Sequence, residues 1–201
     1  MEIILSKNAG FCPGVRRADE AVKSLINARA EGDLIFTLGP LIHNGVYVSE
    51  LDEMGVRAVN ISDVQSIIKN NPDRRITFVI RTHGVSLSDE AFLRRIESEN
   101  PLVTILDMTC PSVKRIHKIA TENTSDDTYF ILFGSPTHPE SVATISYAKG
   151  PSAIISSEDE LKNIDFQCKV PILCAQTTAN LLQFIQIKKF LKKTIYKRDF
   201  F

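Results

Sequence analysis

The chain has 201 residues, of which 43% are apolar and 24% charged, a composition typical of a globular protein with a sizeable buried core. Lys plus Arg and Asp plus Glu both number 24, so no net charge favours nucleic acid or an anionic membrane as a partner. No apolar stretch approaches the roughly 20 residues that cross a bilayer, and residues 1–11 lack the layout of a signal peptide, which predicts a cytoplasmic protein.

Short apolar runs alternate with helix-like stretches along the chain. Seven runs are rich in β-branched and aromatic residues and too short for helices, which predicts strands at 2–6, 34–38, 76–80, 102–106, 129–133, 152–156 and 170–175. Four stretches carry apolar residues at helical spacing, namely 16–30, 88–99, 112–123 and 180–193. Continuous apolar strands separated by helices predict an α/β fold with mostly parallel, buried sheets.

The spacing of these elements predicts two α/β modules in tandem. We expect the first module at residues 1–110 and the second at 111–201, with a boundary near residues 108–112. No Ser/Gly-rich linker marks this boundary, and the two halves resemble variations of one architecture.

Chemically active side chains follow the predicted strands. In open α/β sheets, ligands bind beyond the carboxyl ends of the strands. The residues at these positions are Cys12, His43, Asn44, His83, Cys110, His138, Glu140 and Thr177. They include three of the four histidines and two of the four cysteines. The fourth histidine, His117, falls inside a predicted helix, and we expect it to be structural.

Each of these residues also has a purely structural interpretation. A cysteine at a strand end is often a small buried hydrophobe, and a histidine before Gly or Pro often bonds to the backbone. Thr178 or Asn180 can cap the following helix, and Pro139 fits the first turn of a helix capped by Thr137 or His138. The concentration of thiols, imidazoles, hydroxyls and a carboxylate at one edge favours a functional site.

The residue types limit what this edge binds. Histidines and hydroxyls beside helix N-termini donate hydrogen bonds to anions such as phosphate or diphosphate, and Glu140 beside His138 suits proton transfer. Two thiols from separate loops fit zinc, copper(I) or an iron–sulfur cluster. The two commonest nucleotide-binding motifs, G-x-G-x-x-G and G-x₄-G-K-[ST], are absent from the sequence.

The ordered motifs "GFCPGVRRA", "LIHN", "RTHGVS", "DMTCPSV", "GSPTHPE" and "QTT" resemble the LytB family of 4-hydroxy-3-methylbut-2-enyl diphosphate reductases. The resemblance runs from residue 1 to about residue 180. It implies a cytoplasmic iron–sulfur enzyme of three similar α/β modules around a central pocket. Such an enzyme removes the substrate hydroxyl reductively in the non-mevalonate pathway of isoprenoid biosynthesis, with single electrons from ferredoxin or flavodoxin.

The resemblance also implies roles for individual residues. Cys12 and Cys110 resemble two of three ligands of a 4Fe–4S cluster, with Gly10 and Gly14 allowing close approach. Glu140 resembles the proton-relay acid, and Thr177 the residue that hydrogen-bonds the substrate hydroxyl. The residues that resemble the binding site for the substrate diphosphate are His43, Asn44, His83 and His138.

The sequence departs from the family pattern in its last part. The resemblance implies a third module after the "QTT" helix, but the sequence there ends in "KKFLKKTIYKRDFF", so we expect this module and its cluster cysteine to be absent. Cys168 and Cys174 lie upstream of "QTT" and match no ligand position. Cys174 is expected to pack into the sheet. Two alternatives therefore stay open: a non-catalytic remnant that keeps a diphosphate-binding edge, and a zinc site of Cys12, Cys110 and one histidine. The basic tail, with six Lys/Arg in the last fourteen residues, fits a membrane-surface helix, a frayed terminus or an altered reading frame.

Overall fold

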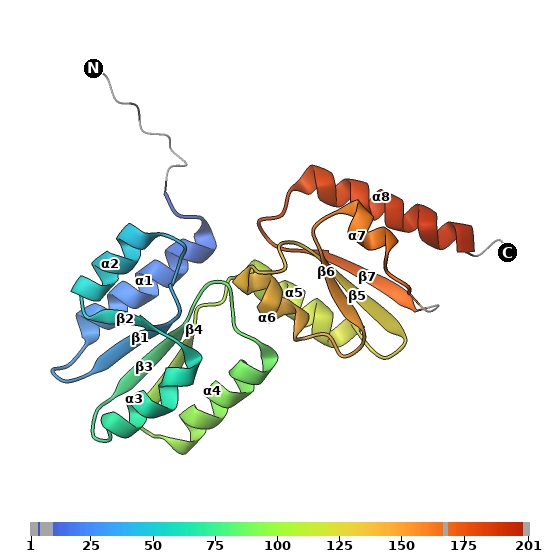
Figure 1. Cartoon of the computed structure of the whole chain (residues 1–201). Coiled ribbons are helices and arrows are strands. Elements are labelled where there is room, and N and C mark those ends of the chain that lie inside the picture. Colours follow the sequence, from blue (N-terminus) through green and yellow to red (C-terminus); the bar gives the residue numbers. More distant parts are fainter. Residues whose placement is uncertain (1–3, 5–9, 167–168, 199–201) are drawn as a thin grey trace. The chain divides into compact units, whose positions relative to one another are not determined.

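The computed structural model describes residues 4, 10–166 and 169–198 (Figure 1). The chain divides into two compact units, the first of Met1–Thr82 and Phe92–Cys110 and the second of His83–Ala91 and Pro111–Phe201. The strand predicted at 2–6, Cys168 and the last three residues of the basic tail lie outside the described residues, apart from Ile4. The module boundary near residue 110 and the third module stay predictions.

The first unit contains a parallel four-stranded sheet in the order β2-β1-β3-β4. Its strands are β1 (Leu34–Leu38), β2 (Val56–Val59), β3 (Ile76–Ile80) and β4 (Val103–Asp107). Its helices are α1 (Pro13–Ala28), α2 (Gly45–Glu53), α3 (Val64–Asn70) and α4 (Leu87–Glu99). The first residues of α4 belong to the second unit. Helices α1 and α2 lie on one face of the sheet and α3 and α4 on the other (Figure 1). Ala18 and Val22 of α1 pack in one buried cluster with Ile35 of β1 and Val79 of β3.

The second unit contains a parallel three-stranded sheet in the order β6-β5-β7. Its strands are β5 (Thr128–Phe133), β6 (Ser152–Ile155) and β7 (Val170–Ala175), and its helices are α5 (Pro111–Asn123), α6 (Pro139–Ile145), α7 (Glu158–Lys162) and α8 (Leu181–Arg198). Among the described residues, no helix combines the length and the apolar character that crossing a membrane requires.

Strand β5 shows why the apolar runs of the sequence are continuous. Phe130 and Leu132 pack in a cluster with Ala120 of α5, whereas Ile131 and Phe133 pack in a separate cluster with α7 and α8 residues. Because side chains alternate between the faces of a strand, both faces of this sheet are covered by helices. The prediction of an α/β fold with parallel, buried sheets is confirmed.

The predicted elements differ from the observed ones mainly at their ends. The predictions for β1, β3 and β7 match the observed bounds, and β4 lies one residue later than its predicted range of 102–106. Helix α1 begins at Pro13 instead of Arg16, so Gly14 lies in a helical turn and not in an irregular bend. The elements α2, β2, α3 and α7 had no counterpart among the predictions.

Candidate functional site

Cys12 lies at the start of α1, where it is exposed and holds the N-cap position. Its backbone is extended, with φ −61° and ψ 161°, and Pro13 occupies the first helical position that suits its fixed φ. In the described part of the chain its side chain caps no backbone amide of α1. The thiol is therefore presented at the end of a helix without a structural hydrogen bond at that end.

Cys110 lies in the loop that follows β4 and is half-buried. Its backbone N–H donates to Thr82 O at 2.9 Å, which ties the loop to the end of β3. Arg17 Nη2, from α1, donates to Thr109 O at 2.7 Å. Two neighbouring elements thus hold the loop at the carboxyl end of the sheet.

Gly14 brings the first turn of α1 against Cys110. A Cβ atom at this position would lie 2.8 Å from Cys110 Sγ, closer than such atoms approach in proteins. The turn that begins at Cys12 therefore packs directly on the Cys110 thiol, whereas the close approach to iron expected of Gly10 and Gly14 stays a prediction. Gly10 is different: a Cβ there meets no described atom within 4 Å, and its φ of 119° shows that it serves the backbone conformation instead.

We expect Gly14→Ala to displace Cys110 and to lower the free energy of unfolding by about 1–3 kcal/mol, the usual cost of overpacking. Gly45→Ala is the matched control, because a Cβ at Gly45, at the start of α2, has no described atom within 4 Å. Urea unfolding of both variants measures the difference. Equal stability of the two variants would show that the contact between Gly14 and Cys110 tolerates a methyl group.

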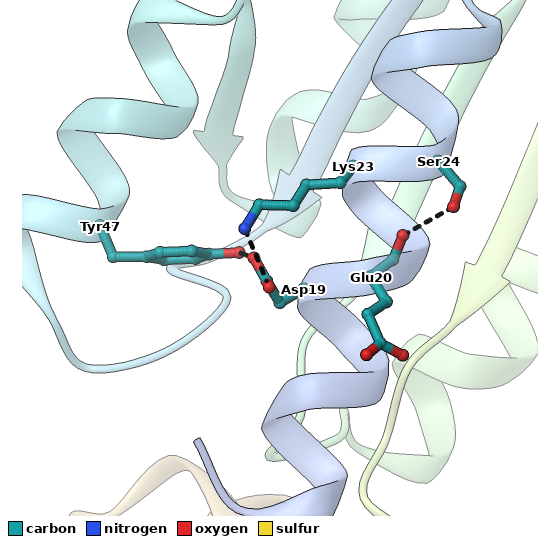
Figure 2. Close-up of polar contacts among 5 residues, drawn as sticks. All are labelled: Asp19, Glu20, Lys23, Ser24 and Tyr47. Carbon is teal, nitrogen blue, oxygen red and sulfur yellow. Dashed lines mark hydrogen bonds and ion pairs between the residues drawn. The ribbon is translucent and has the colours of Figure 1, made fainter. Parts of the chain in front are cut away.

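A buried polar contact between Asp19 and Tyr47 joins α1 to α2 (Figure 2). Tyr47 Oη donates to Asp19 Oδ1 at 2.9 Å, and Lys23 Nζ pairs with Asp19 Oδ2 at 3.1 Å. Burial, followed by the hydrogen bond to Asp19, raises the pKa of Tyr47 above its usual range. The Tyr47 ring also contacts the Phe11 ring edge-on, with centroids 5.6 Å apart. Because Phe11 adjoins Cys12, this contact helps to fix the turn that carries the thiol.

His43 and Asn44 lie in the first unit, between β1 and α2, and both are exposed. Asn44 is the N-cap of α2, and its Oδ1 accepts from Tyr47 N at 3.2 Å. The side-chain oxygen of Asn44 is thus engaged in the helix cap, and its Nδ2 group is the donor that could contact a ligand. The roles of both residues in binding substrate stay predictions.

In the second unit, His83 and His138 lie side by side. Their ring centroids are 5.2 Å apart and the rings are nearly perpendicular, at 87°. His138, one of the two caps that the sequence allowed, is the N-cap of α6, and Pro139 follows it in the first turn. Its Nδ1 accepts from Glu140 N at 3.2 Å, so the proton of the neutral ring is on Nε2. This tautomer gives His138 a ring N–H donor that suits an anionic ligand.

Glu140 is buried, with 2% of its surface exposed. Its Oε1 accepts from Thr177 N at 2.6 Å and its Oε2 from Thr177 Oγ1 at 2.7 Å. Thr177 itself is exposed. The two residues therefore form a continuous hydrogen-bonded path from a buried carboxylate to an exposed hydroxyl, an arrangement suited to proton transfer.

Gln176 holds this part of the site together, although only its neighbour Thr177 was a candidate from the sequence. Its Oε1 accepts from Ser135 N at 3.0 Å and Ser141 Oγ at 3.2 Å, and its Nε2 donates to Thr178 Oγ1 at 2.7 Å. The amide thus joins the end of β7 to the loop after β5 and to α6. Its place in the "QTT" motif was the available signal.

Comparison with known proteins shows what this chain is related to. A family model described as "LytB protein" matches residues 3–200. The chain belongs to the LytB family. Two relatives are named 4-hydroxy-3-methylbut-2-enyl diphosphate reductase. The one from Geobacter sulfurreducens is 34% identical to this chain over 199 residues, and the one from Caldanaerobacter subterraneus subsp. tengcongensis is 33% identical over 183 residues. These matches cover 98% and 91% of this chain, but only 63% and 59% of the relatives. The chain therefore spans about three fifths of the length of these curated relatives.

Solved structures of LytB reductases share the fold. One structure of (E)-4-hydroxy-3-methyl-but-2-enyl diphosphate reductase, the terminal enzyme of the non-mevalonate pathway, matches with a TM-score of 0.69 and 27% identity, over 94% of this chain and 63% of that chain. The reductase from Plasmodium falciparum matches with a TM-score of 0.76 and 24% identity, over 94% of this chain and 55% of that chain, and supports the fold alone.

Two residues outside the LytB site motifs are structural, as the sequence predicts. His117 of α5 is buried and stacks on Tyr147, with ring centroids 4.0 Å apart. Cys174 of β7 packs in a buried cluster with Phe130 and Leu132, and this burial raises the pKa of its thiol. Burial of this kind is typical of a structural cysteine.

Proposed function

We propose that this chain forms the cluster-binding and proton-transferring part of a 4-hydroxy-3-methylbut-2-enyl diphosphate reductase in the cytoplasm. The reaction takes two electrons and two protons, breaks the carbon–oxygen bond of the substrate alcohol, and yields water with isopentenyl or dimethylallyl diphosphate. We propose further that the chain provides two of three modules, with a boundary near residue 110. The names of its 33–34% identical relatives support this assignment.

Cys12 and Cys110 are the proposed protein ligands of a 4Fe–4S cluster. The donor set fits such a group, because both residues are free thiols, exposed or half-buried, on turns that pack together. Thiolate sulfur is the ligand that iron–sulfur clusters require. Such a cluster would supply single electrons to the substrate and would bind its hydroxyl. Neither Cys168 nor Cys174 is assigned as the third ligand, which we propose to lie outside residues 1–201.

Glu140 and Thr177 are the proposed proton-transfer pair. The Thr177 hydroxyl donates to Glu140 Oε2, and the Thr177 backbone N–H holds Glu140 Oε1. We propose that Glu140, once protonated, donates its proton to Thr177 Oγ1 while the Thr177 hydroxyl donates its own proton to the substrate hydroxyl, which then leaves as water. The hydrogen bonds position both groups before the substrate arrives.

The diphosphate is the proposed ligand of the imidazoles of His43, His83 and His138, with Asn44 as a further donor. The Nε2–H of His138 is a suitable donor because its Nδ1 is already occupied by Glu140 N–H. Ferredoxin or flavodoxin is the proposed electron donor.

The observation that carries the proposal is the packing of the Cys12 turn on Cys110 Sγ through Gly14. The test is anaerobic reconstitution of the 201-residue chain with iron and sulfide, followed by iron counting and electron paramagnetic resonance. A cluster signal supports the reductase assignment. Stoichiometric zinc after purification would favour a zinc site instead, and a chain that takes up no metal would favour a non-catalytic diphosphate-binding protein.

We expect His138→Ala to spare the cluster and to weaken diphosphate binding by about tenfold, the effect of losing one hydrogen bond to a charged group. Isothermal titration with inorganic pyrophosphate measures the affinity, and iron content measures the cluster. The control is Lys118→Ala, which changes an exposed side chain of α5 and leaves every histidine in place. His117→Ala is not suitable, because His117 is buried against Tyr147 and its loss would disturb packing. Loss of iron in His138→Ala would contradict the division of roles.

A further inference from the structure

Helix α6 carries the site residue His138 at its N-terminus. The residues at its other end contact the segment that begins with His83, a second site residue. His138 caps its N-terminus, and Ser146 and Tyr147 directly follow its last residue, Ile145. The segment that they contact is His83–Ala91, which belongs to the same compact unit. This segment begins with His83, the ring neighbour of His138.

Ser146 and Tyr147 join the end of α6 to this segment by hydrogen bonds. Ser146 Oγ accepts from Leu87 N at 2.9 Å, and it donates to Ala143 O at 2.6 Å within its own turn. Tyr147 Oη shares its one proton between Glu90 Oε2 at 2.7 Å and Val85 O at 3.2 Å. Val85, at 7% exposure, is buried beside this contact. The segment is therefore held to α6 at three separate residues.

Tyr147 is itself held rigidly. Its side chain is buried, and its ring stacks on His117 of α5 with an interplanar angle of 17°. The packing of this aromatic pair therefore helps to place the hydroxyl. A group fixed in this way can set the position of its partner.

We propose that Tyr147, assisted by Ser146, is a positioning residue that holds His83 against His138. Only Gly84 separates His83 from Val85, and its φ of 77° is a conformation that favours glycine. Because Val85 is two residues from His83, we expect a change in the position of the Val85 carbonyl to change the position of His83. The identity of the ligand that uses this histidine pair, a diphosphate, rests on the proposed function, whereas the positioning itself does not.

The distance between the His83 and His138 imidazoles affects how well the pair can bind an anion. Two rings 5.2 Å apart can donate to oxygens of one diphosphate group, but a hydrogen bond weakens steeply once its length or angle departs from the normal range. Pre-positioning both donors also removes part of the ordering cost of binding. Loss of the Tyr147 contacts should therefore weaken anion binding without removing any group that touches the anion.

The test compares Tyr147→Phe with Tyr129→Phe in the full 201-residue chain. Tyr147→Phe keeps the ring that stacks on His117 and removes only the hydroxyl. Tyr129→Phe removes a hydroxyl for which the described residues provide no hydrogen bond, while its ring keeps its contact with Phe166. Long-range proton–nitrogen NMR correlations of the imidazoles are recorded without ligand, and pyrophosphate affinity is measured by titration calorimetry.

We expect the His83 imidazole signals to shift in Tyr147→Phe and to stay unchanged in Tyr129→Phe, with pyrophosphate bound about tenfold more weakly in Tyr147→Phe alone. Ser146→Ala removes the hydrogen bond from Leu87 N and should shift the same His83 signals. It replaces Tyr147→Phe as the test variant if Tyr147→Phe does not fold. Unchanged His83 signals in both variants would overturn the proposal. If the signals shift but the wild-type chain does not bind pyrophosphate, the positioning role is supported and the diphosphate assignment fails.

Discussion

We expect the Cys12→Ser chain to hold less than about a tenth of the wild-type iron after anaerobic reconstitution, because a serine hydroxyl is a poor ligand for the iron of a thiolate-bound cluster. Cys12 is exposed at the start of α1, and its replacement leaves the buried core of the first unit intact. Iron and sulfide counting, with electron paramagnetic resonance of the reduced chain, measures the loss. Circular dichroism of the same samples should show an unchanged fold.

Cys174→Ala is the control for this experiment. It removes a thiol that is buried among Phe130 and Leu132, so iron content should stay at the wild-type level while the free energy of unfolding falls by about 1 kcal/mol. Iron counts that match between Cys12→Ser and wild type would reject Cys12 as a ligand. A loss of iron in Cys174→Ala would show instead that the wrong thiol had been assigned.

The strands were predictable because burial on both faces leaves a continuous apolar run. The run "ITFVI" matches β3, and Phe78, Val79 and Ile80 are all buried. Leu102 was assigned to β4 from its apolar character, yet it is 41% exposed and precedes the strand. Hydropathy cannot distinguish a residue at the end of a strand from one in the loop beside it.

Three of the four missed elements, α3, α7 and β2, are short or lie at an edge of a sheet. Helix α7 has five residues and α3 has seven, too few for a helical period to emerge. Strand β2 lies at the edge of its sheet, and Arg57 and Ala58 are exposed. A local signal existed for α7, because Ser157 caps it and accepts from Glu160 N at 3.3 Å, in the S-x-x-E pattern of a helix start.

The site motifs were predictable as residue types at strand ends, but their hydrogen-bond partners were not. Tyr47 and Asp19 are 28 positions apart, and Thr177 and Glu140 are 37 apart. Such contacts depend on how distant helices and loops pack together, and this packing leaves no local pattern in a single sequence. The supporting residues Gln176 and Tyr147 therefore became visible only in the structure.

Glu140→Gln should lower the rate of substrate reduction by about 10²–10⁴-fold, the usual contribution of a general acid. The amide keeps the shape of the carboxylate, and its oxygen still accepts from Thr177 N, so the fold of the second unit should be retained. The amide cannot deliver the proton that converts the leaving hydroxyl to water. Single-turnover product formation in the chemically reduced, reconstituted protein measures the loss, and iron content confirms that the cluster is present.

Glu160→Gln is a close match as a control for Glu140→Gln. The Glu160 carboxylate also accepts from the backbone N–H and the hydroxyl of one residue, Ser156, at 2.8 and 2.7 Å. It differs in being exposed, at the start of α7 and away from Thr177. Glu160→Gln should therefore react at the wild-type rate. A wild-type rate in Glu140→Gln as well would show that the proton reaches the substrate by another path, whereas equal losses in both variants would show that the effect is on folding and not on proton transfer.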